Sequence, residues 1–252
     1  MDNGKQIRPG RAYESTRNEL LAEAGVMALA VAAVYFLHGR GRAMPAAMGA
    51  IIALRFLTLN RRGDWIFFLL GVVLGGGNDV LSMYKGVYHY NAATVLPVPI
   101  PLWMVVFWGQ VFVSFRKLMR FGPFKGPDEQ SLPLIDAPLA LDIVIAVIYR
   151  MIIYRTASTP WLPDALFAAI LIIRLLVLPP RLHERRLMLA MIVIGPLYEM
   201  LLIGCGLYVY QTGVILGMPL WLIVYWVFII RALKAIFDRV ENVLATAPRK
   251  GW

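Results

Sequence analysis

The sequence has 252 residues, of which 60% are hydrophobic and only 16% are charged, and its mean hydropathy is +0.67. These fractions differ so far from those of soluble domains that most of the chain is expected to contact lipid. The formal net charge of +10 does not indicate nucleic-acid binding, because Lys and Arg fall between apolar runs, as in cytoplasmic loops that face anionic lipid. The single cysteine, Cys205, excludes a disulfide framework and a thiolate metal site.

Residues 1–19 are polar and basic and are expected to form a cytoplasmic tail. A bilayer core about 30 Å thick needs roughly 20 apolar residues per helix. Segments that approach this length predict an all-α integral membrane protein with about eight transmembrane helices. In chain order these are expected at 20–37, 44–59, 65–83, 100–115, 138–154, 161–178, 187–207 and 219–237.

The positive charges of the loops predict the orientation. With the N-terminus inside, one set of loops is rich in Lys and Arg and the opposite set is poorer, which is the bias of cytoplasmic loops. Both termini are therefore expected in the cytoplasm, with a bacterial inner membrane as the expected location. The cytoplasmic set holds Arg61, Arg62, Arg116, Lys117, Arg120, Lys125, Arg181, Arg185 and Arg186.

An internal repeat accompanies the hydropathy pattern. A shift of about 119 residues superposes charged residues as well as apolar ones, namely Glu23 on Asp142, Arg55 on Arg174 and Asp79 on Glu199. We therefore expect four-helix repeats at 20–120 and 138–237, a linker at 121–137 and a cytoplasmic tail at 238–252. Because four is an even number, both repeats insert with the same topology, related by a pseudo-two-fold axis along the membrane normal.

Ionisable groups in the bilayer are costly and are expected to pair inside the helix bundle. Glu23 and Arg55 are predicted at similar depth near the cytoplasmic ends of their helices, and Asp142 and Arg174 repeat that arrangement. We interpret both sets as buried ion pairs that fix helix registry.

Asp79 and Glu199 differ from these pairs because neither has a basic residue nearby on its own helix. One hypothesis is that desolvation keeps each carboxyl protonated, so that it can donate a proton to an apolar substrate. The alternative is that both carboxyls hydrogen-bond across the pseudo-axis, or to Tyr88 and Tyr208.

Aromatic residues recur at matching places in the two repeats. They are interpreted as an interfacial belt, as core, or as the wall of a pocket for a long apolar ligand. The candidate lining residues are Tyr88, Tyr90, Trp103, Trp108, Tyr208, Tyr210, Trp221 and Trp226. No metal site is expected, because His38, His89 and His183 lie far apart in the sequence.

Asp79 is followed by Gly86-Val-Tyr88-His-Tyr90 and Pro99-Ile-Pro101, and Glu199 is followed by Gly206-Leu-Tyr208-Val-Tyr210 and Gly217-Met-Pro219. This pattern, which covers the last two helices of each repeat, resembles the duplicated repeats of the membrane-embedded lycopene cyclases and the related carotenoid hydratases. The resemblance implies proton-initiated chemistry on an isoprenoid, with Asp79 and Glu199 as the acidic residues. The cyclases carry paired glutamates after the proline, where this chain has Leu102-Trp103 and Leu220-Trp221, so a hydratase-like or uncharacterised member is implied rather than a true cyclase.

Three functions remain open from the sequence. The first is an isoprenoid-modifying membrane enzyme that uses Asp79 and Glu199 and needs no redox cofactor. The second is a small transporter or lipid-binding protein in which the same carboxylates move protons or contact the ligand. The third is a non-catalytic subunit of a membrane complex. The expected partners are a membrane lipid or an apolar isoprenoid, and a homo- or hetero-oligomer is possible.

Overall fold

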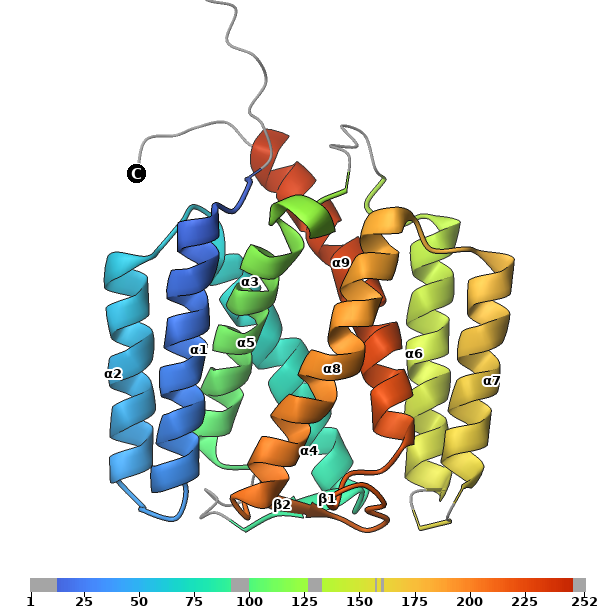
Figure 1. Cartoon of the computed structure of the whole chain (residues 1–252), viewed down its shortest axis with the longest axis horizontal. Helices are drawn as coiled ribbons and strands as arrows, with labels where there is room; N and C mark the ends of the chain where they lie inside the picture. The colour runs from blue at the N-terminus through green and yellow to red at the C-terminus, as the bar shows by residue number, and fades with distance from the viewer. Residues whose placement is uncertain (1–12, 92–99, 127–132, 157, 160, 247–252) are drawn as a thin grey trace, which may run out of the picture.

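The computed structural model describes residues 13–91, 100–126, 133–156, 158–159 and 161–246. These residues form an all-α fold apart from one pair of three-residue strands (Figure 1). The first half contains α1 (Arg17–Leu37), α2 (Ala43–Thr58), α3 (Asp64–Leu70), the π-helical η1 (Gly71–Gly76), α4 (Gly77–Tyr84), β1 (Tyr88–Tyr90), α5 (Leu102–Met119) and the 3-10 helix η2 (Gly122–Phe124). The second half contains α6 (Ala137–Thr156), α7 (Leu162–Val177), α8 (Leu182–Gly204), β2 (Tyr208–Tyr210) and α9 (Trp221–Thr246).

Local sequence signals explain several helix boundaries. A capping box starts α1, in which the amide of Glu19 donates to Thr16 Oγ1 at 3.2 Å and the amide of Thr16 donates to Glu19 Oε2 at 3.0 Å. Pro101 directly precedes α5, and Pro163 lies in the first turn of α7, where its missing N–H is not needed. Helix starts therefore follow from residues that satisfy or omit the first free amides.

The chain is an integral membrane protein, as expected. Among the described residues, five helices are long and apolar enough to cross a membrane, and α2 is a shorter apolar helix. The five are α1, the continuous helix Asp64–Tyr84, α5, α6 and α8. The prediction of eight such helices is therefore only partly supported by length and composition.

The last helix differs from its expected range of 219–237. The helix continues to Thr246. Its second half carries charged side chains that are buried in the protein, namely Arg231, Lys234, Arg239 and Glu241. A helix with such a polar segment lacks the uniform hydropathy of a simple span. Part of the expected C-terminal tail is thus a packed helix.

The two halves meet in the middle of the bundle. Figure 1 shows α1 with α2 at one side, α6 with α7 at the other, and the more central α3–α4, α5, α8 and α9 between them. At the end of the bundle opposite the described terminal segments, β1 pairs antiparallel with β2, so that Tyr88 is opposite Tyr210 and Tyr90 is opposite Tyr208. The core is therefore formed by both repeats.

Candidate functional site

A buried carboxyl group with several hydrogen-bond donors lies in the first turn of α4. Asp79 is only 4% exposed and accepts three hydrogen bonds. Tyr88 donates to Oδ1 at 2.6 Å, Tyr90 donates to Oδ2 at 2.6 Å, and the indole Nε1 of Trp108 donates to Oδ2 at 2.7 Å. A carboxyl group removed from water is thus supplied with hydrogen-bond donors from β1 and α5.

The second repeat builds the same cluster around Glu199 on α8, which is 6% exposed. Tyr208 donates to its Oε2 and Tyr210 donates to the same oxygen at 3.5 Å. Trp226 Nε1 donates to Oε1 at 3.2 Å. Each repeat therefore surrounds one acid with two tyrosines and one tryptophan.

The two-stranded sheet joins the clusters. Tyr88 lies 5.1 Å from Tyr210 and 5.5 Å from Tyr208 between ring centroids. Because strand side chains alternate, the tyrosines turn toward the bundle while His89 and Val209 point outward and are exposed. Burial raises the pKa of each of these tyrosines well above its usual value, so they remain protonated donors.

A glycine one helical turn before each acid makes room for the tryptophan. A Cβ at Gly75 would lie 2.6 Å from the ring of Trp108, and a Cβ at Gly195 would lie 2.6 Å from the ring of Trp226. Residues four apart share one helix face, so glycine and acid together receive the indole. In the sequence, this feature is a glycine four residues before Asp79 and four before Glu199, and neither glycine was predicted to belong to the site.

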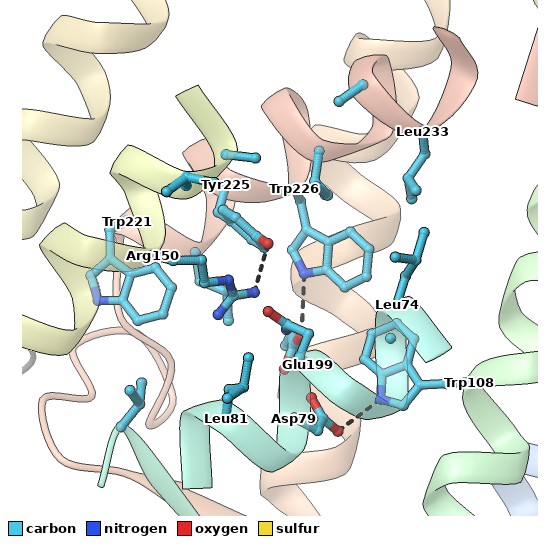
Figure 2. A pocket seen from close by; sticks show the side chains of 18 of the residues that line it. Leu74, Asp79, Leu81, Trp108, Arg150, Glu199, Trp221, Tyr225, Trp226 and Leu233 are labelled. Carbon is cyan, nitrogen blue, oxygen red and sulfur yellow. Dashed lines mark hydrogen bonds between the residues drawn. The ribbon is translucent and has the colours of Figure 1, made fainter. Parts of the chain in front are cut away.

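A cavity of about 500 Å³ adjoins both clusters. It lies between α4 of the first repeat and α6 and α9 of the second, and its wall is mostly apolar. Figure 2 shows Asp79 and Glu199, from different helices, together with Trp108 and Trp226 at the same part of the cavity. Its volume falls within the range of natural small-molecule sites.

Arg150, which falls within the expected helix 138–154 and was not predicted to belong to the site, also lines this cavity (Figure 2). Its Nη2 donates to the hydroxyl of Tyr225 at 2.6 Å, and its Nη1 donates to Ser82 Oγ at 3.1 Å. The guanidinium is thereby fixed near the carboxylate clusters by contacts to α4 and α9. Its role was not apparent from sequence because it lies near the polar end of α6.

Most of the residues expected to line a pocket do line this cavity. Asp79, Glu199, Tyr88, Tyr90, Trp108, Tyr208, Tyr210, Trp221 and Trp226 all line it. The exception is Trp103, which is buried in α5 but is not among the lining residues, so its assignment to the pocket wall is corrected. The tyrosines expected as a possible interfacial belt are largely buried, because they donate to the acids.

The outer helices of the two halves pack differently. In the first half α1 packs against α5 and also against α8. In the second half, α6 and α4, the element that corresponds to the end of α8, both line the apolar cavity. Two similar sequences thus place their outer helices differently against the neighbouring repeat.

The ionisable residues near the other end of the bundle form ion pairs. Arg55 Nη2 lies 3.2 Å from Glu23 Oε2, and Arg174 Nε lies 2.6 Å from Asp142 Oδ1. Asp64, which was not among the residues expected to form ion pairs, accepts from Arg55 Nη2 at 2.7 Å. Its position just before an apolar helix resembled an ordinary helix start, and only the fold brings it to Arg55.

Comparison with known proteins finds a matching family and a similar fold. The model of the family described as "Protein of unknown function (DUF2878)" matches residues 22–123 and again 147–247. The fold is similar to crystal structures of MvINS, a mycobacterial Insig homolog from Mycobacterium vanbaalenii, at 20% identity and a TM-score of 0.57, covering 73% of this chain and 96% of that chain. A cross-linked MvINS trimer gives 21% identity with the same TM-score and coverage. No curated protein matches the sequence.

The expected resemblance to the lycopene cyclases is therefore wrong. The repeated family match and the MvINS fold contradict it. The residues that suggested it have a structural explanation: the acid and the Gly-x-Tyr-x-Tyr segment of each repeat form the hydrogen-bonded clusters and the sheet that joins them. Such packing requirements recur without implying common chemistry.

Proposed function

This chain belongs to the family described as "Protein of unknown function (DUF2878)", and we propose that it binds a membrane lipid or isoprenoid in the cavity between its repeats. The observation that carries the proposal is an apolar cavity of about 500 Å³ with fixed polar groups at one part of its wall. Lipid and cofactor sites combine these features, because apolar walls provide affinity and a few polar groups fix orientation.

The polar groups favour an uncharged hydrogen-bonding end on the ligand. Asp79 and Glu199 are acceptors, while Arg150 is a donor, and all line the cavity. A hydroxyl group can donate to the carboxylates and accept from the guanidinium. We therefore propose a long apolar molecule with a neutral hydroxyl, and not a purely hydrocarbon ligand.

Acid chemistry on such a ligand stays a prediction. Each carboxyl group already accepts hydrogen bonds from two tyrosines and one tryptophan, and the Trp108 and Trp226 indoles are donors only. This arrangement holds Asp79 and Glu199 in place as acceptors. It supports recognition better than delivery of a proton.

The proposal is tested by filling the cavity. Ala146 on α6 lines the cavity, whereas Ala140 on the same helix is exposed and does not line it. Wild type, Ala146→Trp and Ala140→Trp are purified in mild detergent, and their bound lipids are extracted and identified by mass spectrometry. Circular dichroism checks that each variant is folded.

We expect one lipid class enriched over the membrane extract in wild type and in Ala140→Trp, and lost from folded Ala146→Trp. The same lipid profile in all three proteins would contradict ligand binding in this cavity. A new modified lipid formed by wild type and lost in Asp79→Asn would instead favour the enzymatic function.

We also propose that eight helices span the membrane, with both termini in the cytoplasm. The basic residues Arg61, Arg62, Arg181 and Arg186 support this orientation, because they lie in connections or first turns at the end that carries the described terminal segments (Figure 1). By analogy with the cross-linked MvINS trimer, we extend the proposal to a homo-oligomer. Chemical cross-linking in native membranes tests it, and monomer alone at every reagent concentration would count against it.

A further inference from the structure

A second cavity, of about 230 Å³, lies at the other end of the bundle, where the basic residues gather. It is lined by the ends of α5, α7 and α9 and by the beginnings of α6 and α8. Leu139 and Asp142 line both cavities, so the second one adjoins the apolar cavity. Its wall contains five arginines and four acids, namely Arg120, Arg174, Arg181, Arg231, Arg239, Asp136, Asp142, Glu184 and Asp238.

Two of these arginines lie close together, and neighbouring carboxylates compensate their positive charges only in part. Arg174 is 2% exposed and Arg231 is 8% exposed. Arg174 Nη1 and Arg231 Nη2 both donate to the carbonyl oxygen of Leu178, at 3.1 and 3.2 Å. Two guanidinium groups on one oxygen repel each other, and this repulsion is little screened when they are buried.

Three buried nitrogens of this pair have no hydrogen-bond partner within the described residues. They are Arg174 Nη2, Arg231 Nε and Arg231 Nη1. Asp142 binds the Nε of Arg174, and Glu184 Oε1 is 3.8 Å from Arg231 Nε, which is too long for a hydrogen bond. Buried donors of this kind are usually satisfied, and each costs stability when it is not.

In the first repeat a carboxylate lies between two buried cations of the matching cluster. Asp64 accepts from Arg55 at 2.7 Å and also from Arg116, so one carboxylate is placed between two cations. Glu184 occupies the corresponding position of the second repeat and accepts from the backbone amide of Arg181 at 2.6 Å, as Asp64 does from Arg61 at 2.9 Å. Its other oxygen, however, stays 3.8 Å from Arg231 Nε. Among the described residues, the second repeat therefore presents two arginines that no single carboxylate bridges by hydrogen bonds.

We propose that this cavity binds a phosphate-class oxyanion between Arg174 and Arg231. Guanidinium groups bind phosphate through paired N–H donors, and a tetrahedral anion offers acceptors in several directions to donors from two helices. The anion is either free phosphate or the headgroup of a phospholipid whose chains extend along the bundle. This site is independent of the lipid proposed for the apolar cavity.

The test is thermal unfolding of the full chain in detergent with phosphate, compared with chloride at equal ionic strength, and in nanodiscs with phosphatidylglycerol compared with phosphatidylcholine. The variant is Arg231→Gln, which removes a buried and poorly paired charge and is expected to fold. The matched control is Arg61→Gln, the same change at an exposed residue of the same end of the bundle.

We expect phosphate, phosphatidylglycerol or both to raise the melting temperature of wild type and Arg61→Gln. Binding by Arg231→Gln should be weaker by about tenfold or more, since it loses charge-assisted hydrogen bonds. Stabilisation by phosphate indicates a free anion site, and stabilisation by phosphatidylglycerol alone indicates a headgroup site. No stabilisation by either, or equal stabilisation of Arg231→Gln, would overturn the proposal.

Ala146→Trp separates the two proposals. This variant fills the apolar cavity at a residue that does not line the second cavity, so it should retain the effect of phosphate. Loss of the extracted lipid with retention of the phosphate effect means that the two sites act separately. A failure of the lipid proposal therefore leaves the anion site standing, and the reverse is also true.

Discussion

The indole ring of Trp108 lies directly on Gly75, so closely that a Cβ at residue 75 would be 2.6 Å from the ring. This contact sets the distance at which the indole Nε1 reaches Asp79, one turn further along the same helix. Gly195, Trp226 and Glu199 repeat the relationship in the second half of the chain. Close packing and hydrogen bonding in the site are thus parts of one arrangement.

Gly75→Ala should therefore destabilise the protein by about 1–3 kcal/mol, the usual cost of overpacking. The matched control is Gly77→Ala in the same helix, because a Cβ at Gly77 meets no atom within 4 Å. Alanine is the better helix former, so the control should be neutral or stabilised by roughly 0.5–1 kcal/mol. Thermal unfolding in detergent compares the two variants, and equal stability would show that Trp108 moves aside without cost.

Arg55→Gln should be strongly destabilising, because the side chain is fully buried and pairs with both Glu23 and Asp64. Removal of one partner from a buried ion pair typically costs about 3–5 kcal/mol, since the remaining charges lose their compensation. Arg61→Gln is the comparison: its side chain is 56% exposed and pairs with Glu19 at 2.5 Å, so the expected cost is about 0–1 kcal/mol.

Urea or thermal unfolding of both arginine variants in the same detergent gives the difference. A cost for Arg55→Gln no larger than that for Arg61→Gln would mean that the buried network contributes little to stability. The double variant Arg55→Gln/Glu23→Gln measures the coupling between the partners.

The proposed orientation predicts the accessibility of introduced cysteines. In a Cys205→Ser background, His89→Cys places an exposed thiol next to the sheet, and Arg186→Cys places one at the basic end. A membrane-impermeant maleimide is added to cells whose outer membrane is permeabilised and whose inner membrane is intact, and it should label residue 89. It should label residue 186 only after the inner membrane is also permeabilised. The opposite pattern would reverse the orientation.

The amino-acid sequence alone was sufficient to identify a duplicated, all-helical membrane protein. Hydropathy is a local property, so the apolar runs predict helices, although the charged end of α9 and the short helices left only five clear spans among the described residues. The repeat also identified Asp79 and Glu199 as equivalent, because a shift of the chain superposes charges as well as apolar residues.

The tertiary structure decided what these residues do. Whether Tyr88 faces lipid or Asp79 depends on strand pairing across the repeats, and apolar residues that face lipid or protein look alike in sequence. Because the sequence does not show these contacts, the acid followed by Gly-x-Tyr-x-Tyr suggested the wrong family. Only packing shows that α1 contacts α8, whereas the apolar cavity lies between α4 of the first repeat and α6 and α9 of the second.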